Sequence, residues 1–177
     1  GLAEQVSIYT ELREAFGVNG IPAMIIEHAL PELERDANRT LQQLTRGRMH
    51  VRFDTQRETK TGNLRETLDI IISDEKGTRP YESFSGGEQF RINFAIRVAL
   101  SRMLAQRAGV RLRSLFVDEG FGALDTDGRQ RLVEAVKAVE GEFDMILVIT
   151  HIDELREAFP TQIQVTKTDG GSQVEIL

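Results

Sequence analysis

The sequence contains no cysteine among its 177 residues, which excludes a disulfide scaffold, a thiolate metal site and a cysteine nucleophile. No apolar run approaches the ~20 residues that span a bilayer, and the N-terminal segment lacks the basic-then-apolar layout of a signal peptide. These absences predict a soluble, intracellular protein. The length fits one domain or one lobe of a larger one, and the glycine at position 1, in place of a methionine, favours a fragment.

The charge of the chain is moderately acidic overall but uneven. Its 28 acidic and 22 basic residues give a net charge of −6, which argues against a protein that coats nucleic acid over its whole surface. Residues 39–65 nevertheless hold seven basic and only two acidic side chains. A basic strip on an acidic body can bind a polyanion on one face, although a solvated hairpin surface explains the same charges.

Two helices and a hairpin are predicted in the first half. Apolar residues between Leu2 and Phe16 recur at steps of four and three, which is typical of a heptad seam or of a short amphipathic helix. A second helix runs from Pro22 to Gly47, and Pro31 either kinks or restarts it. Strands are expected over 49–54 and 68–73, paired as a hairpin around a polar loop.

The second half alternates strands and helices. Segments at 114–118 and 144–150, which are apolar between polar end residues, are typical of buried strands in a parallel sheet. Helices are expected over 85–108, 127–139 and 153–158. Strands over 162–168 and 173–176 are joined by a good hairpin turn. This order indicates an α/β fold with crossover connections.

The helix over 85–108 opens with a serine, two glycines and a glutamate. Ser85 and Glu88 have the spacing of a capping box. Two glycines between them allow a ligand to approach the free N–H groups of the helix start, where the helix dipole favours an anion. Taken alone, this element more often marks a capped helix that binds nothing.

The two apolar strands are each followed by titratable side chains. Asp118 and Glu119 end the first strand, and the carboxyl edge of an α/β sheet is where such folds bind ligands. Phosphoryl-transfer enzymes use one acid for Mg²⁺ and another to orient or deprotonate water. His151 follows the second strand, so parallel pairing would bring it to the same edge. A solvated turn and a surface histidine are the alternatives.

The order of these elements is more specific than any one of them. The chain resembles ATP-binding cassette domains in four motifs. FSGGEQ is similar to the signature motif and LFVDE to the Walker B motif, whereas Ala-Leu-Asp at 123–125 is similar to the D-loop and His151 to the switch histidine. Within that superfamily the chain resembles the SbcC-type ATPases of DNA double-strand-break repair, which are relatives of the SMC proteins. This resemblance extends along nearly the whole chain, because it includes the segment GIPAMIIEHALPELERDANRTLQQLTRGRMHVRF and the run FSGGEQFRINFAIRVALS.

The resemblance implies the C-terminal lobe of an ABC-type ATPase head at 21–177, with a parallel-sheet core, flanking helices and β-hairpins, after the end of a coiled coil or linker at 1–20. It also implies ATP and Mg²⁺ as cofactors. The resemblance further implies that the start of the helix binds nucleotide through Ser85, Gly86, Gly87 and Glu88, and that Ser85 and Gly87 contact the γ-phosphate of ATP on the opposite subunit. In the second half, it implies that Asp118 binds Mg²⁺ through water and that Glu119 is the general base. It also implies that Asp125 contacts the partner across the dimer and that His151 senses the γ-phosphate.

One motif of the superfamily is missing. The sequence contains no G-x-x-x-x-G-K-[ST], so nothing in it can cradle the α- and β-phosphates. In SbcC-like proteins the P-loop lies in an N-terminal lobe, separated from the C-terminal lobe by a long coiled coil. We therefore interpret the chain as a half-head that is inactive alone, with heptad-like residues 2–16 as the returning end of the coil.

The expected function is ATP-driven DNA end processing by a cytoplasmic, nucleoid-associated protein without a membrane partner. The implied partners are the lobe that carries the P-loop, a second head, an SbcD-type nuclease and DNA. A condensin-like SMC head is the main alternative, and an ABC transporter ATPase is disfavoured because a β-hairpin precedes the signature. Candidate DNA contacts in the basic strip are Arg46, Arg48, Arg52, Arg57 and Lys60.

Overall fold

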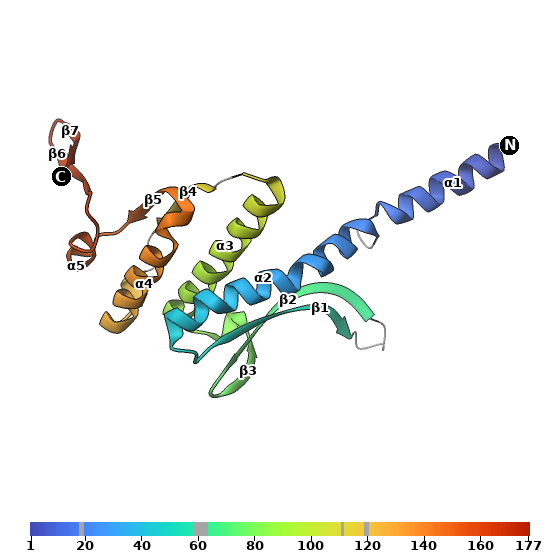
Figure 1. The fold of residues 1–177 in the computed structure, drawn as a ribbon, viewed down its shortest axis with the longest axis horizontal. Coiled ribbons are helices and arrows are strands. Elements are labelled where there is room, and N and C mark those ends of the chain that lie inside the picture. Colours follow the sequence, from blue (N-terminus) through green and yellow to red (C-terminus); the bar gives the residue numbers. More distant parts are fainter. Residues whose placement is uncertain (18–19, 59–63, 111, 119–120) are drawn as a thin grey trace. The chain divides into compact units, whose positions relative to one another are not determined.

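The computed structural model describes residues 1–17, 20–58, 64–110, 112–118 and 121–177 (Figure 1). The chain divides into two compact units, Gly1–Val110 and Arg111–Leu177, and each is described by itself. No helix within the described ranges is long and apolar enough to cross a membrane.

The described residues of the first unit form three α-helices. Helix α1 covers Leu2–Ala15 and buries none of its side chains, so its predicted apolar seam is open along its length. Helix α2 covers Ile21–Thr45 and continues through Pro31 without a break. It ends where Arg46 and Gly47 both adopt positive φ, as the glycine predicted. Helix α3 covers Gly86–Ala108 and agrees with the predicted range.

The first unit also holds a three-stranded antiparallel sheet in the order β1-β2-β3. Strands β1 (His50–Glu58) and β2 (Leu64–Asp74) form the predicted hairpin but extend into the segment expected to be a loop, because cross-strand pairing stabilises polar residues that have no strand pattern of their own. Strand β3 (Gly77–Pro80) was missed, since its four residues carry no alternation. The short 3₁₀ helix η1 (Tyr81–Ser83) leads into α3.

The core of the first unit lies where α2, α3 and the sheet meet (Figure 1). Helix α2 lies beside α3 and packs on β1. The three elements contribute fully buried aliphatic side chains, and small residues on the helices allow close approach. The most buried members are Ala37, Leu41, Val51, Ile72, Ile92, Ala95 and Ala99.

Polar side chains of α2 cover the outer edge of β1. The Asn38 amide donates to the Val51 carbonyl and its oxygen accepts from the Val51 N–H, both at 2.8 Å. One helical turn earlier, the Glu34 carboxylate accepts from the Phe53 N–H at 3.2 Å. The helix thus satisfies backbone groups that a bare edge strand would leave open to pairing with another chain.

The second unit contains the predicted parallel pair. Strand β4 (Leu112–Asp118) pairs in parallel with β5 (Phe143–Ile149), and α4 (Thr126–Val139) is the helix of the crossover. The expectation that β4 is buried on both faces was wrong for this chain. Leu115 and Val117 are buried on one face, whereas Phe116 on the other is 56% exposed, because no element of the second unit covers that face within the described residues.

Short elements complete the second unit. The 3₁₀ helices η2 (Phe121–Ala123) and η3 (Glu140–Glu142) lie on either side of α4, and α5 (Asp153–Arg156) follows β5. Strands β6 (Ile163–Thr168) and β7 (Gly171–Ile176) form the predicted terminal hairpin, and all of its side chains are exposed.

Candidate functional site

The predicted capping box is present at the start of α3. Ser85 is the N-cap, and the Glu88 carboxylate accepts hydrogen bonds from the Ser85 N–H at 2.9 Å and from its hydroxyl at 2.8 Å. Gly86 is exposed and Gly87 is buried. The single hydroxyl proton of Ser85 is committed to Glu88, so it must rotate before it can donate to an anion at the helix start.

The Glu88 carboxyl is held in its ionised form. Partial burial would raise its pKa, but the hydrogen bonds from the Ser85 N–H and hydroxyl, together with the positive charge of Arg79, bring the pKa below the ordinary value of 4.5. At neutral pH the carboxylate is therefore an acceptor that fixes the orientation of the cap.

Side chains of α3 hold the loop in front of the cap. The Asn93 amide donates to the Tyr81 hydroxyl at 2.7 Å, and the Gln89 amide donates to the Tyr81 carbonyl at 3.4 Å. The same carbonyl accepts from the Phe84 N–H at 3.2 Å. The helix start is thus preorganised by local contacts before any ligand arrives.

The second unit brings the ends of β4 and β5 together as predicted. Asp118 is the last residue of β4 and lies opposite Ile149 in the parallel register. His151 follows Ile149 by two residues, after a turn in which the Thr150 hydroxyl accepts from the Ile152 N–H at 3.1 Å. Asp118 and His151 are both exposed at this carboxyl edge. Glu119, the predicted general base, lies outside the described residues.

Asp125 has a structural role that the sequence analysis did not anticipate. It is the N-cap of α4, and its carboxylate accepts from the Gly128 N–H at 2.9 Å. The Arg129 guanidinium donates to the Phe121 carbonyl at 3.4 Å, which fastens η2 to the first turn of α4. Aspartate immediately before a helical pattern is a common N-cap, and this signal would have found the role.

The donor chemistry of both segments fits ATP and Mg²⁺. Mg²⁺ takes oxygen ligands and commonly binds proteins through one or two carboxylates, with phosphates and water completing its shell. The exposed Asp118 carboxylate can provide such a ligand, although no group of three or more metal-binding side chains occurs in the part of the chain that the structure describes. The start of α3 presents N–H groups suited to a phosphate.

The candidate DNA contacts do not form one uniform cluster. Arg46 is the C-cap of α2, and the Arg48 guanidinium donates to the Thr45 carbonyl at 3.1 Å, so both help to end the helix. Arg52 projects from β1 with an exposed side chain 3.5 Å from Asp54. Arg57 lies in β1, but its side chain is outside the described part, as is the whole of Lys60.

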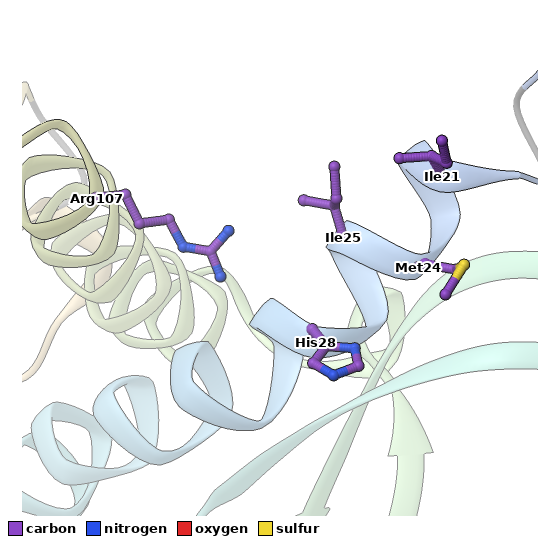
Figure 2. Close-up of a pocket in the computed structure, with 5 residues that line it drawn as sticks. All are labelled: Ile21, Met24, Ile25, His28 and Arg107. Atoms are coloured by element: carbon purple, nitrogen blue, oxygen red, sulfur yellow. The ribbon is translucent and has the colours of Figure 1, made fainter. Parts of the chain in front are cut away.

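An open apolar groove lies at the other end of the helices (Figure 2). Ile21, Met24, Ile25 and His28 of α2 line it together with Arg107 of α3. Arg107 is 22 residues beyond Ser85 on one continuous helix, which corresponds to ~33 Å. The groove is therefore remote from the cap and contributes nothing to a phosphate site there.

Comparison with known proteins finds sequence relatives among SbcC and Rad50 proteins. The family model "SbcC/RAD50-like, Walker B motif" matches residues 42–138. The SbcC component of the nuclease SbcCD from Treponema pallidum is 32% identical over 148 residues, which are 82% of this chain and 14% of that protein. The probable DNA double-strand break repair Rad50 ATPase of Aquifex aeolicus is 35% identical over 126 residues, which are 71% of this chain and 12% of that protein.

Solved structures share the fold. The Smc head domain with a coiled coil and joint from Pyrococcus yayanosii aligns with a TM-score of 0.70 and 22% identity, over 99% of this chain and 32% of that one. A structure from work on ATP-driven dimerization of SMC ATPases aligns with a TM-score of 0.69 and 20% identity, over 88% of this chain and 89% of that one. These likenesses confirm the predicted ATPase-head fold, with its parallel pair, flanking helices and antiparallel hairpins.

The chain spans only 12–14% of the length of the two curated relatives, so the comparisons establish the family and the fold of this segment. The matched range 42–138 is more than half of the chain and includes the capped start of α3, Asp118 and Asp125. The chain therefore belongs to the SbcC/RAD50-like Walker B family.

Proposed function

We propose that this chain is the C-terminal half of an ATPase head that works in DNA double-strand-break repair. The observation that carries the proposal is the parallel register of β4 and β5, which brings Asp118 and His151 to one sheet edge. The sequence has no P-loop, so the half-head hydrolyses ATP only after an N-terminal lobe and a second head complete the site.

Each side chain of the site then has a distinct task. Asp118 would hold Mg²⁺, Glu119 would take a proton from the attacking water, and His151 would contact the γ-phosphate. Mg²⁺ itself neutralises charge on the phosphates when it is bound. Ser85 and Gly87, with Gly86 and Glu88 shaping the same turn, contact the γ-phosphate on the opposite head, and Asp125 lies at the contact between heads.

Open apolar faces in the second unit support a missing lobe. Phe116, Met145 and Ile149 are exposed on the same face of β4 and β5. Ile163, Val165, Val174 and Ile176 are exposed in cross-strand pairs on one face of the terminal hairpin. Contiguous apolar surfaces of this kind are typical of faces that a partner covers. The lobe with the P-loop is the occupant that the family suggests.

A DNA-repair role is favoured over chromosome structuring by sequence similarity. The curated relatives, an SbcC component of SbcCD and a probable Rad50 ATPase, are 32% and 35% identical, whereas the SMC heads are 20–22% identical and share the fold. We propose that the head dimerises on ATP, regulates an SbcD-type nuclease, and contacts DNA phosphates through the basic strip at 39–65 without sequence preference.

The test measures ATP hydrolysis and dimerisation of this chain alone and after mixing with its N-terminal lobe. We expect no hydrolysis by the chain alone, hydrolysis by the mixture, and an ATP-locked dimer when Glu119→Gln is introduced. Glu140→Gln, an exposed change at the end of α4, is the matched control and should behave as wild type. Hydrolysis by the chain alone would contradict the half-head, and an inactive mixture would favour a scaffold.

A further inference from the structure

Arg79 connects the β2–β3 hairpin to the residue before the cap of α3. Its guanidinium carbon lies 4.3 Å from the centroid of the Phe84 ring, a cation–π distance. The same guanidinium forms an ion pair with Asp74, across the hairpin turn from it. The Arg79 side chain is 32% exposed and that of Asp74 is 12% exposed, so both lie mostly out of water.

Asp74 is itself held in place as an anion. Its carboxylate accepts from the Lys76 N–H at 2.9 Å within the turn between β2 and β3. Burial would raise its pKa, but this hydrogen bond and the Arg79 guanidinium bring the pKa below its ordinary value of 3.8. Asp74 therefore orients Arg79 over the ring from a fixed position on the hairpin.

Phe84 links the Arg79 guanidinium to residues 85–87 at the start of α3, which we call the signature segment. The ring is 5% exposed and belongs to the same core cluster as Ile92 of α3. Phe84 precedes Ser85 directly, so a shift of the ring changes the backbone that presents the cap. The Arg79 charge also acts on Glu88, the carboxylate that holds the Ser85 hydroxyl.

One hydrogen-bond donor of the Arg79 guanidinium is left unsatisfied among the described residues. This donor is the Nε atom, which is buried. An arginine selected only for stability would be expected to satisfy this donor, since a buried unpaired donor costs free energy. The ring and the carboxylate instead define where the guanidinium lies.

We propose that Arg79 is a positioning residue for the signature segment: through Phe84 it sets the orientation of the N–H groups at 85–87 toward the opposite head's ATP. This inference rests on the proposed function. In this proposal Arg79 acts on the nucleotide only through Phe84, and Asp74 in the β2–β3 turn fixes the other side of the guanidinium. A cation–π contact that lies mostly out of water is worth enough to change an equilibrium constant by about tenfold or more, so removal of Arg79 should weaken ATP-driven dimerisation by at least about tenfold.

The experiment uses the full-length protein with Glu119→Gln, so that hydrolysis does not disturb the dimerisation equilibrium. The ATP concentration for half-maximal dimerisation is measured with Arg79→Ala, Arg79→Lys, Phe84→Leu, the double variant of Arg79→Ala with Phe84→Leu, and Lys76→Ala. ATP affinity of the monomeric head and the melting temperature are measured in parallel. Lys76→Ala removes an exposed cation from the same turn and is the matched control.

We expect Arg79→Ala to raise the required ATP at least about tenfold while monomer ATP affinity stays unchanged, because the signature segment acts on the other head's nucleotide. Arg79→Lys keeps the charge but not the planar stacking, so it should give an intermediate defect. Phe84→Leu should give the same defect and add little to Arg79→Ala.

Three results would overturn the inference. The first is wild-type dimerisation by Arg79→Ala, and the second is an equal defect in Lys76→Ala. The third is loss of monomer ATP affinity together with dimerisation, which would show general damage to the head. If the starting protein, which carries Glu119→Gln and an intact Arg79, forms no ATP-driven dimer, the proposed function itself is overturned. That result is seen before any Arg79 variant is made, so it is distinct from a failure of this inference.

Discussion

At the scale of single residues, Asp125 serves the fold and is also proposed to act between heads. Its carboxylate caps α4 through the Gly128 N–H, so the two roles can be separated only by a substitution that keeps the cap. Asparagine and aspartate are about equal as N-caps, whereas alanine is much poorer.

We expect Asp125→Ala to lower the free energy of unfolding by about 1 kcal/mol and Asp125→Asn to leave it nearly unchanged, because only alanine removes the acceptor for Gly128. Urea denaturation of the chain measures both. Glu157→Ala, an exposed change near α5, is the control and should stay within about 0.5 kcal/mol of wild type. Equal losses in the alanine and asparagine variants would show that the charge, rather than the cap, stabilises α4.

At the scale of elements, the join between α2 and β1 depends on one buried amide. Asn38 is 5% exposed and satisfies both backbone groups of Val51. It is also 3.2 Å from a ring nitrogen of His50. The polar face of α2 is therefore part of the sheet's hydrogen bonding, and the heptad and helical patterns of the sequence give no sign of it.

Asn38→Ala should destabilise the first unit by about 3 kcal/mol, because it leaves a buried N–H and a buried carbonyl without partners. Thermal and urea unfolding of the chain test this expectation. Gln43→Ala changes an exposed side chain of the same helix and should have little effect. If Asn38→Ala unfolds no more easily than Gln43→Ala, water replaces the amide and the edge of β1 is not covered as described.

At the scale of the whole molecule, the exposed apolar faces of the second unit allow the proposed contact with a P-loop lobe to be tested. The exposed Phe116 ring contributes little to the stability of the chain alone, yet it would be buried by a lobe packed on β4 and β5. Stability and association should therefore respond differently to its removal.

Phe116→Ser should leave the melting temperature of the chain nearly unchanged and weaken its binding to the P-loop lobe by about 2 kcal/mol, roughly thirtyfold, because burial of a large apolar side chain is lost. Calorimetric titration of one lobe with the other measures this. The control is Thr166→Ala, which changes the face of the β6–β7 hairpin opposite its apolar face and should leave the affinity unchanged. Unchanged affinity of Phe116→Ser would mean that the lobe binds elsewhere.

Local interactions were predictable from the sequence by itself. The capping box joins residues three apart, the parallel strands are marked by wholly apolar runs, and the order of the motifs indicated the family that the comparisons confirm. The capping box has its cause within one helical turn, and each apolar run marks its own strand, so both can be recognised from short stretches of sequence. The roles of the individual site residues stay predictions, because the two segments lie in different units and Glu119 lies outside the described residues.

Only the tertiary structure decided how those elements are joined. The Asn38 amide reaches Val51 from another element, and Arg79 contacts Phe84 from a strand too short to predict. Phe116 is left exposed although it lies in the apolar run of β4. Such contacts depend on how a helix, a hairpin and an open sheet face meet in space. They follow no sequence period, since packing selects single side chains at an interface rather than a repeating pattern along the chain.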